Sequence, residues 1–421
     1  MSDHASVTAP RPRILFVDDD RGVLDGLQNI LRKHRHQWDM VFVLGGEAAL
    51  DELQRASFDV VVSDMRMPGI DGPAVLRKVK DAHPGAARIV LSGNADPEAV
   101  ARALPVTHQF MSKPCDAAVL RDLIDRTCRL SQLLRGEAIR RVVGRLDTLP
   151  SAPAAYWELT QAVANPDTSI DDLARIVQRD PAMSVKVLQL VNSAYFGLAR
   201  RMTSIQEAVA YLGVELLKSL ALTVHVFERM EQKHLDLEGF SVSVMQERAL
   251  LTARVAKRVV TDAKCADEAF TAGLVHDIGK MIMAVGLPEQ FIESIRVARA
   301  TGQPLHVVEK ELVGASHAEV GAYLLGVWGL PFSIVEAVAN HHEPQAIQQG
   351  SRAVLTALHV ADVLVAAVCA GDDAPERGLD AVFLEQVGGL GKVARWVAIA
   401  REECQSGDRA QRQSEATRGA R

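Results

Sequence analysis

The stretch DVVVSDMRMPGIDG, residues 59–72, decides the fold of the N-terminal part of this chain. Its three valines, at residues 60–62, are typical of a strand that is buried on both faces of a parallel sheet. The carboxylate of Asp64 follows the strand, and Met67, Pro68 and Gly69 suit a turn. Because open α/β sheets carry their sites at the carboxyl ends of the strands, we expect Asp64 to lie at a functional site.

Three more apolar segments, at residues 13–17, 89–91 and 108–111, are each followed by polar side chains. A further strand is expected near residues 40–43, and helical patterns separate the strands. This alternation predicts a doubly wound, five-stranded parallel sheet of the flavodoxin type, whose carboxyl ends meet at one edge. The polar residues expected to converge there are Asp18, Asp19, Asp64, Ser92 and Lys113.

Such a set has the groups that phosphoryl transfer needs. Clustered carboxylates bind Mg²⁺, a hard cation that prefers oxygen ligands. The metal ion and the ammonium group of Lys113 would neutralise charge on the transferred group, while Asp64 would attack as the nucleophile.

The order of strand, Asp64, two residues, Met-Pro and Asp-Gly resembles the phosphoacceptor segment of receiver domains from two-component response regulators. The resemblance implies that a histidine kinase phosphorylates Asp64. It also implies that Mg²⁺ is held by Asp18, Asp19, Asp64 and the backbone carbonyl of Arg66.

The same resemblance implies that Ser92 and Lys113 contact the phosphoryl oxygens. Phe110 occupies the position of the aromatic switch residue of receivers, and an ordinary core phenylalanine is the alternative interpretation.

Composition places the chain among ordinary globular proteins and argues against a nucleic-acid footprint. It has 421 residues, 48% of them hydrophobic and 24% charged, with a formal net charge of -6.

The five cysteines form no CxxC pair, which favours reduced thiols in the cytoplasm. The first residues lack the apolar core of a signal peptide. Residues 353–370 are apolar enough to mimic a membrane span, but they contain His359 and Asp362, so we predict a buried helix and no membrane association.

The patterns predict five consecutive parts. Residues 129–145 lack proline and read as a helical connector, which would carry a signal and pair in a homodimer, or pack only on its own domain. The polar C-terminal end lacks aromatic residues and is expected to be disordered. The parts are a disordered tail (1–11), a receiver (12–128), the connector (129–145), an all-α output domain (146–400) and a disordered tail (401–421).

Strand signals vanish in the second domain, and helical signals repeat. Ser204 with Glu207 forms a capping box, and Asp180-Pro181 opens a further helix. Residues 149–153 (LPSAP), 191–197 (VNSAYFG) and 204–222 resemble HDOD domains, the HD-related output domains, as do AGLVHDIGKM and HAEVGAYLLGVWGLP further on. The resemblance implies an all-α, HD-like fold.

Enzymes of the wider HD superfamily bind metal through a histidine from an early helix, a His-Asp pair and a later aspartate, and the cyclic di-GMP phosphodiesterases among them add further histidines. By resemblance Lys280 would meet a substrate phosphate. Imidazole and carboxylate ligands suit Fe, Mn or Zn, which would activate a bound water for attack on phosphorus. The matching ligand positions are His276, Asp277, His317, His341, His342 and Asp362.

Two departures weigh against catalysis. The first ligand is expected near Glu247 or Arg248, yet no histidine occurs between His234 and His276, so Glu247 would have to replace it. No Gly-Tyr-Pro signature follows His341-His342. The residues thus favour a relic of an ancestral site or an adapted binding site. A site that binds metal without turnover and a metal-dependent phosphohydrolase acting on cyclic di-GMP or a nucleotide are the alternatives.

The sequence therefore predicts a cytoplasmic response regulator whose HDOD output acts through a downstream protein or a nucleotide ligand and not through DNA. No helix-turn-helix signal was found in the helical domain.

Overall fold

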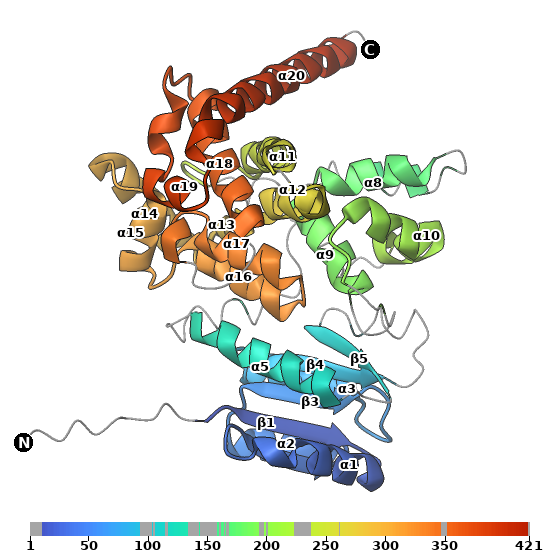
Figure 1. The fold of residues 1–421 in the computed structure, drawn as a ribbon. Helices are drawn as coiled ribbons and strands as arrows, with labels where there is room; N and C mark the ends of the chain where they lie inside the picture. Colours follow the sequence, from blue (N-terminus) through green and yellow to red (C-terminus); the bar gives the residue numbers. More distant parts are fainter. Residues whose placement is uncertain are drawn as a thin grey trace, which may run out of the picture. The chain divides into compact units, whose positions relative to one another are not determined.

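The computed structural model describes residues 11–92, 106–113, 117–133, 168–192, 201–222, 237–260, 262–346 and 352–419, with a few single positions between them. These residues belong to two compact units (Figure 1). The first is built from residues up to 132, and the second from residues 146–192 and 198–421.

The first unit is a five-stranded parallel sheet with the strand order β2-β1-β3-β4-β5. This is the flavodoxin-like order, so the predicted doubly wound sheet is confirmed. Its elements are β1 (Arg13–Asp18), α1 (Arg21–Leu31), β2 (Asp39–Leu44), α2 (Gly45–Arg55), β3 (Val60–Asp64), α3 (Gly72–Ala82), β4 (Ala87–Ser92), β5 (Gln109–Ser112) and α5 (Ala117–Leu133).

Strand β3 is central, and all five of its residues are buried. Alternate side chains of a strand point to opposite faces, so a run of valines is apolar toward both helix layers. Val60 and Val62 pack in one core with residues of α1 and α5, while α3 contacts β3 and β4. The register pairs Val60 with Ile14 of β1 and with Ala87 of β4.

Helix α3 starts very close to the end of β3. Asp71 caps it by accepting a hydrogen bond from the backbone N–H of Ala74 at 2.9 Å. A Cβ atom on Gly72 would lie 2.0 Å from the backbone oxygen of Asp64, which no side chain permits. The Asp-Gly pair thus lets the helix pack directly behind the candidate phosphoacceptor.

The second unit is all-α in its described part, as predicted. Its capping boxes include Ser169 with Asp172 and, not foreseen from the sequence, Ser316 with Glu319. Its helices are α8 (Ile170–Gln178), α9 (Pro181–Val191), α10 (Ile205–Leu222), α11 (Val242–Val259), α12 (Ala266–Val275), α13 (Ile278–Gly286), α14 (Pro288–Thr301), α15 (Leu305–Leu312), α16 (His317–Val327), α17 (Phe332–Asn340), α18 (Arg352–Cys369), α19 (Ala381–Gln386) and α20 (Val393–Gly419).

Helix α18 is the apolar segment that mimics a membrane span. By length and composition it could cross a membrane, with a mean hydropathy of 1.8. However, 56% of it is buried, and it packs against α11, α12, α17 and α20 (Figure 1). These contacts are those of a core helix, as expected from His359 and Asp362 within it.

Two glycines allow the central helices to approach each other closely. A Cβ atom on Gly279 of α13 would lie 1.9 Å from the backbone oxygen of His317 in α16. A Cβ atom on Gly273 of α12 would lie 2.7 Å from the Cα atom of Ala253 in α11. The backbones of these pairs are therefore in contact, which fixes the positions of the polar residues that flank Gly279.

The C-terminal end differs from the prediction. Residues 401–421 were expected to be disordered, whereas α20 continues to Gly419. The central part of α20 packs against the second unit, where Arg258 of α11 forms ion pairs with Glu402 and Glu403 at 2.7 Å each. Cys404 is also buried, with its Sγ atom 3.7 Å from that of Cys369. Composition does not reveal such long-range contacts.

Other predictions fall on residues outside the described ranges. They concern residues 1–10, most of the connector after Leu133, residues 149–153 and residues 193–197. These remain predictions.

The close contact at Gly279 leads to a stability prediction. The substitution Gly279→Ala should lower the free energy of unfolding of the second unit by about 1–3 kcal/mol, the usual cost of overpacking. Thermal unfolding of the full chain would measure it. The control is Gly391→Ala, where a Cβ atom would meet nothing within 4 Å. Equal melting temperatures of the two variants would contradict the close contact.

Candidate phosphoacceptor site and histidine cluster

The carboxyl edge of the sheet brings together Asp18, Asp64 and Lys113, from the ends of β1, β3 and β5. The Nζ atom of Lys113 donates to Asp18 Oδ2 at 2.7 Å and forms an ion pair with Asp64. Burial alone would lower the pKa of Lys113, but the hydrogen bonds and charges of Asp18 and Asp64 outweigh it and raise this pKa. Lys113 is therefore a fixed cation between two carboxylates.

Local backbone geometry orients both carboxylates. The backbone N–H of Arg66 donates to Asp64 Oδ2 at 2.9 Å, and that of Asp20 donates to Asp18 Oδ1 at 2.9 Å. Asp20 in turn caps α1, and Asp19 is exposed between Asp18 and Asp20. The residues predicted for Mg²⁺ thus lie at one edge of the sheet, in the loops that follow β1 and β3.

Ser92 and Phe110 also lie in this part of the sheet, on β4 and β5. Both are buried, Ser92 at the last position of β4. In the β4–β5 register Phe110 pairs with Val90, and Ser92 pairs with Ser112, the residue before Lys113. The structure therefore places Ser92 beside the end of β5, next to Lys113. It places Phe110 in the core, which is compatible both with an aromatic switch residue and with an ordinary core phenylalanine.

The second unit gathers a cluster of histidines and carboxylates from several helices. His276 and Asp277 lie where α12 meets α13, His317 begins α16, His341 and His342 follow α17, and Asp362 lies on α18. All are buried except His342, which is half-buried. Ligand atoms of His276, Asp277 and His341 lie within 4.8 Å of one another, as do those of His317, His341 and His342. Asp362 lies in the same cluster, with its Oδ2 atom 3.9 Å from the Nδ1 atom of His342, so the six predicted positions converge.

Backbone carbonyls fix the orientation of two of these rings. The Nδ1 atom of His276 is 2.7 Å from the carbonyl of Gly273, and that of His341 is 2.7 Å from the carbonyl of Val338. A carbonyl can only accept, so each ring donates from Nδ1 and directs its Nε2 atom inward. Neither Nε2 atom has a well-formed hydrogen bond among the described residues, although that of His276 lies 3.4 Å from Asp362 Oδ1 and 3.5 Å from Asp277 Oδ2. This is how metal-binding histidines are held.

His317 is oriented by Glu309, a residue that the sequence analysis missed. Glu309 is fully buried on α15, and its Oε2 atom accepts from the Nδ1 atom of His317 at 2.6 Å and from its backbone N–H at 2.8 Å. The Nε2 atom of His317 lies 2.9 Å from that of His342. No motif marks Glu309, because its role depends on the packing of α15 against α16.

Arg248, and not Glu247, faces the cluster from α11. The Nη2 atom of Arg248 donates to Asp362 Oδ1 at 3.2 Å, whereas the Glu247 side chain is exposed. Glu247 is therefore not placed as the substitute ligand that the sequence suggested. A one-residue uncertainty in alignment corresponds to a rotation of about 100° on a helix, which moves a side chain from the cluster to solvent.

Each carboxylate of the cluster already has a cationic partner. Lys280 donates to Asp277 Oδ2 at 2.6 Å, as Arg248 does to Asp362. Burial would raise the pKa of Asp277, but the charges of His276 and Lys280 outweigh it, and the pKa lies well below its usual value. The imidazoles suit a transition metal, but the guanidinium group and the ammonium group compete with a metal ion for these carboxylates.

The two sites and the two folds define a class of protein, the two-component response regulators. The family model for the response regulator receiver domain matches residues 14–125. The model for the HDOD domain matches residues 149–344. The chain is therefore a response regulator in which an N-terminal receiver is followed by an HDOD domain.

Curated relatives support this assignment over parts of their length. An uncharacterized protein of Treponema pallidum is 29% identical over 201 residues, which cover 48% of this chain and 39% of that protein. The response regulator protein FleR of Pseudomonas aeruginosa is 32% identical over 162 residues, which cover 38% and 32%. The chain thus spans about a third of the length of these relatives.

Solved structures with similar folds include the MmoQ response regulator from Methylococcus capsulatus. It is 23% identical, covers 60% of this chain and 98% of its own, and has a TM-score of 0.48. The receiver domain of an HD domain-containing protein from Pseudomonas fluorescens is 28% identical, covers 29% of this chain and 98% of its own, and has a TM-score of 0.28.

Burial of His341 leads to a pH prediction. Burial lowers the pKa of His341 to about 3, whereas the pKa of a histidine in the unfolded chain is about 6.5. Below that value the unfolded chain binds the proton and the folded chain does not, so acid favours unfolding by about 1.4 kcal/mol per pH unit for this residue. The free energy of unfolding should therefore fall between pH 7.5 and 5.5.

Urea unfolding would measure this effect, followed by tryptophan fluorescence in a Trp38→Phe background so that the signal comes from the second unit. The matched variant is His341→Asn, whose amide can still donate to Val338 but does not titrate. Its loss of stability over the same pH range should be smaller by about 1 kcal/mol. An identical pH dependence in both proteins would show that folding leaves the pKa of His341 unchanged, and would contradict this prediction.

Proposed function

We propose that this protein receives a phosphoryl group from a histidine kinase on Asp64 and thereby switches its HDOD domain. The observation that carries this proposal is the contact of the partly exposed Lys113 with the buried carboxylates of Asp18 and Asp64 at the carboxyl edge of the sheet. A phosphoryl group on Asp64 adds negative charge and strong acceptor oxygens beside Lys113. Lys113 would then leave its present pairing and contact that group, together with the hydroxyl group of Ser92.

The residues at this edge fit Mg²⁺. Asp18 and Asp64 offer carboxylate oxygens from adjacent strands, Asp19 lies next to Asp18, and the backbone of Arg66 is already bonded to Asp64. These are the oxygen ligands that Mg²⁺ prefers. We propose that the carboxylates of Asp18, Asp19 and Asp64 and the carbonyl of Arg66 hold the ion, which would offset charge during phosphoryl transfer.

The HDOD domain, by this proposal, acts as a binding module toward a downstream protein or a nucleotide and not through DNA. Arg248 supports this function, because it brings a permanent positive charge to Asp362, where a metal-dependent enzyme needs a ligand for its metal ion. We retain the predicted boundaries, 12–128 for the receiver, 129–145 for the connector and 146–400 for the output domain. A cytoplasmic location and a homodimer that pairs through the connector belong to the same proposal.

A metal-dependent phosphohydrolase, acting on cyclic di-GMP or a nucleotide, is the second candidate. It is favoured by the inward Nε2 atoms of His276 and His341 and by the orientation of His317 by Glu309. In that case the histidines, Asp277 and Asp362 would hold Fe, Mn or Zn, and Lys280 would meet the phosphate of the substrate.

Phosphoryl switching predicts a response to beryllofluoride with Mg²⁺, a mimic of the phosphoryl group. Hydrogen exchange in residues 146–400 of the full chain should change when the mimic is added, because the new charge at Asp64 alters the receiver. Asp64→Asn should abolish the response, and Asp51→Asn, an exposed aspartate on α2, should retain it. An unchanged exchange pattern and oligomeric state in the unmutated protein would refute the switch.

Metal analysis separates the two candidate functions. The purified full chain should contain well below one equivalent of Fe, Mn or Zn, and Arg248→His should increase the metal content, because it removes the competing cation and adds an imidazole. Glu247→His, on the exposed side of α11, should not do so. Nearly one equivalent of metal in the unmutated protein, lost in His276→Gln, would instead support the phosphohydrolase.

A further inference from the structure

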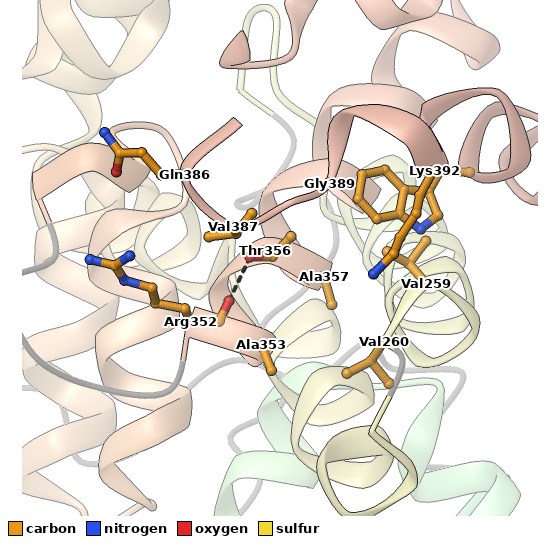
Figure 2. A pocket seen from close by; sticks show the side chains of 11 residues that line it. Val259, Val260, Arg352, Ala353, Thr356, Ala357, Gln386, Val387, Gly389 and Lys392 are labelled. Carbon is orange, nitrogen blue, oxygen red and sulfur yellow. Dashed lines mark hydrogen bonds between the residues drawn. The ribbon is translucent and has the colours of Figure 1, made fainter. Parts of the chain in front are cut away.

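A pocket near the C-terminal end of the second unit lies outside both candidate sites, and all of its lining residues except Val259 and Val260 lie beyond the HDOD match. Its volume is about 320 Å³. It is formed by the end of α11, the start of α18, the end of α19 and the start of α20 (Figure 2). This volume is at the lower end of the range for small-molecule sites, which is roughly 300–1,000 Å³.

The charged side chains of the pocket are all basic. Arg352 and Lys392 are exposed at its edge, and neither forms an ion pair with another residue in the described part of the chain. Figure 2 shows Arg352 and Gln386 on one side and Lys392 on the other. None of the described lining residues is acidic, although the chain as a whole has a net charge of -6.

The start of α18 adds to this positive potential. The helix begins at Arg352, and the first backbone N–H groups of a helix have no partner within it and carry the positive end of the helix dipole. The hydroxyl group of Thr356 donates to the Arg352 carbonyl at 2.6 Å, so its oxygen can still accept from a ligand. The polar groups at this end of the pocket therefore favour an anion.

The rest of the wall is apolar. Ala353 and Ala357 lie on α18 between the two cations (Figure 2). The end of α11 and Trp396 of α20 also line the pocket. A small inorganic anion would leave this surface in contact with water. A ligand with an anionic head and an apolar or aromatic body would cover it and would gain hydrophobic burial and charge-assisted hydrogen bonds together. The apolar lining consists of Val259, Val260, Ala353, Ala357, Val387 and Trp396.

We propose that this pocket binds a small amphipathic anion, with its acid group held by Arg352 at the start of α18, its apolar body on α11, α18 and Trp396, and Lys392 on the opposite side adding positive potential. The same two helices carry Arg248 and Asp362, which pair with each other in the histidine cluster. A bound molecule would thus contact the ends of the two helices whose middles form one edge of that cluster.

The experiment uses 1-anilinonaphthalene-8-sulfonate, an aromatic anion whose fluorescence rises in apolar sites, and the full chain. One saturable site is expected. The double variant Arg352→Gln/Lys392→Gln should bind the probe about tenfold more weakly, because a charged donor at one side and the positive charge at the other side are both lost. The control Arg395→Gln removes an exposed cation of α20 outside the pocket and should leave the affinity unchanged.

A neutral probe and a substitution that fills the pocket with a larger side chain complete the test. N-phenyl-1-naphthylamine has a similar apolar body without the sulfonate, and it should bind more weakly than the anion and be insensitive to the double variant. Ala353→Leu, at a half-buried position of the wall, should weaken the binding of both probes. The proposal is overturned if the anionic probe does not bind, or if it binds the unmutated protein and the double variant equally well.

Discussion

Both candidate sites of this protein depend on a backbone approach that only glycine permits. At Gly72 the start of α3 touches the backbone oxygen of Asp64, and at Gly279 the start of α13 touches that of His317. In each case the helix begins directly behind a residue of the site, so the side chain of that residue is set by packed backbone. Positions that must hold a charge or an imidazole to within a fraction of an ångström need this kind of support.

The two sites differ in how cationic side chains pair with their buried carboxylates. In the receiver a single cation, Lys113, serves two carboxylates, and it is available to a new anionic group on Asp64. In the helical unit each carboxylate has its own cation, Lys280 for Asp277 and Arg248 for Asp362. The first arrangement is suited to a change of charge, whereas the second is already neutralised without any ligand.

Much of the fold and the receiver site was predictable because the signals are local. A run of valines before Asp64 indicates a buried strand, and the carboxyl ends of parallel strands must meet, so Asp18, Asp64 and Lys113 could be grouped from their order alone. The six histidine and aspartate positions of the second unit were found through a family resemblance and do converge.

The features that the sequence did not reveal depend on contacts between distant segments. Glu309 lies in no motif and matters only because α15 packs beside α16. The choice between Glu247 and Arg248 depends on the rotation of α11 about its axis, which spacing alone leaves uncertain by one residue. The helical C-terminal segment is held by Arg258, which is more than 140 residues away from its partners.

The packing at Gly279 also bears on how such domains diverge. His276, Asp277 and His317 are part of the core, so replacing any of them costs stability whether or not the protein performs catalysis. Residue 248 lies at the edge of the cluster and is partly solvated, so a different side chain fits there without overpacking, provided that the charge of Asp362 is still balanced. In this domain the His-Asp pair therefore contributes to the packing of the core as well as to any chemistry, and the side chain at position 248 bears more directly on whether a metal ion can bind beside Asp362.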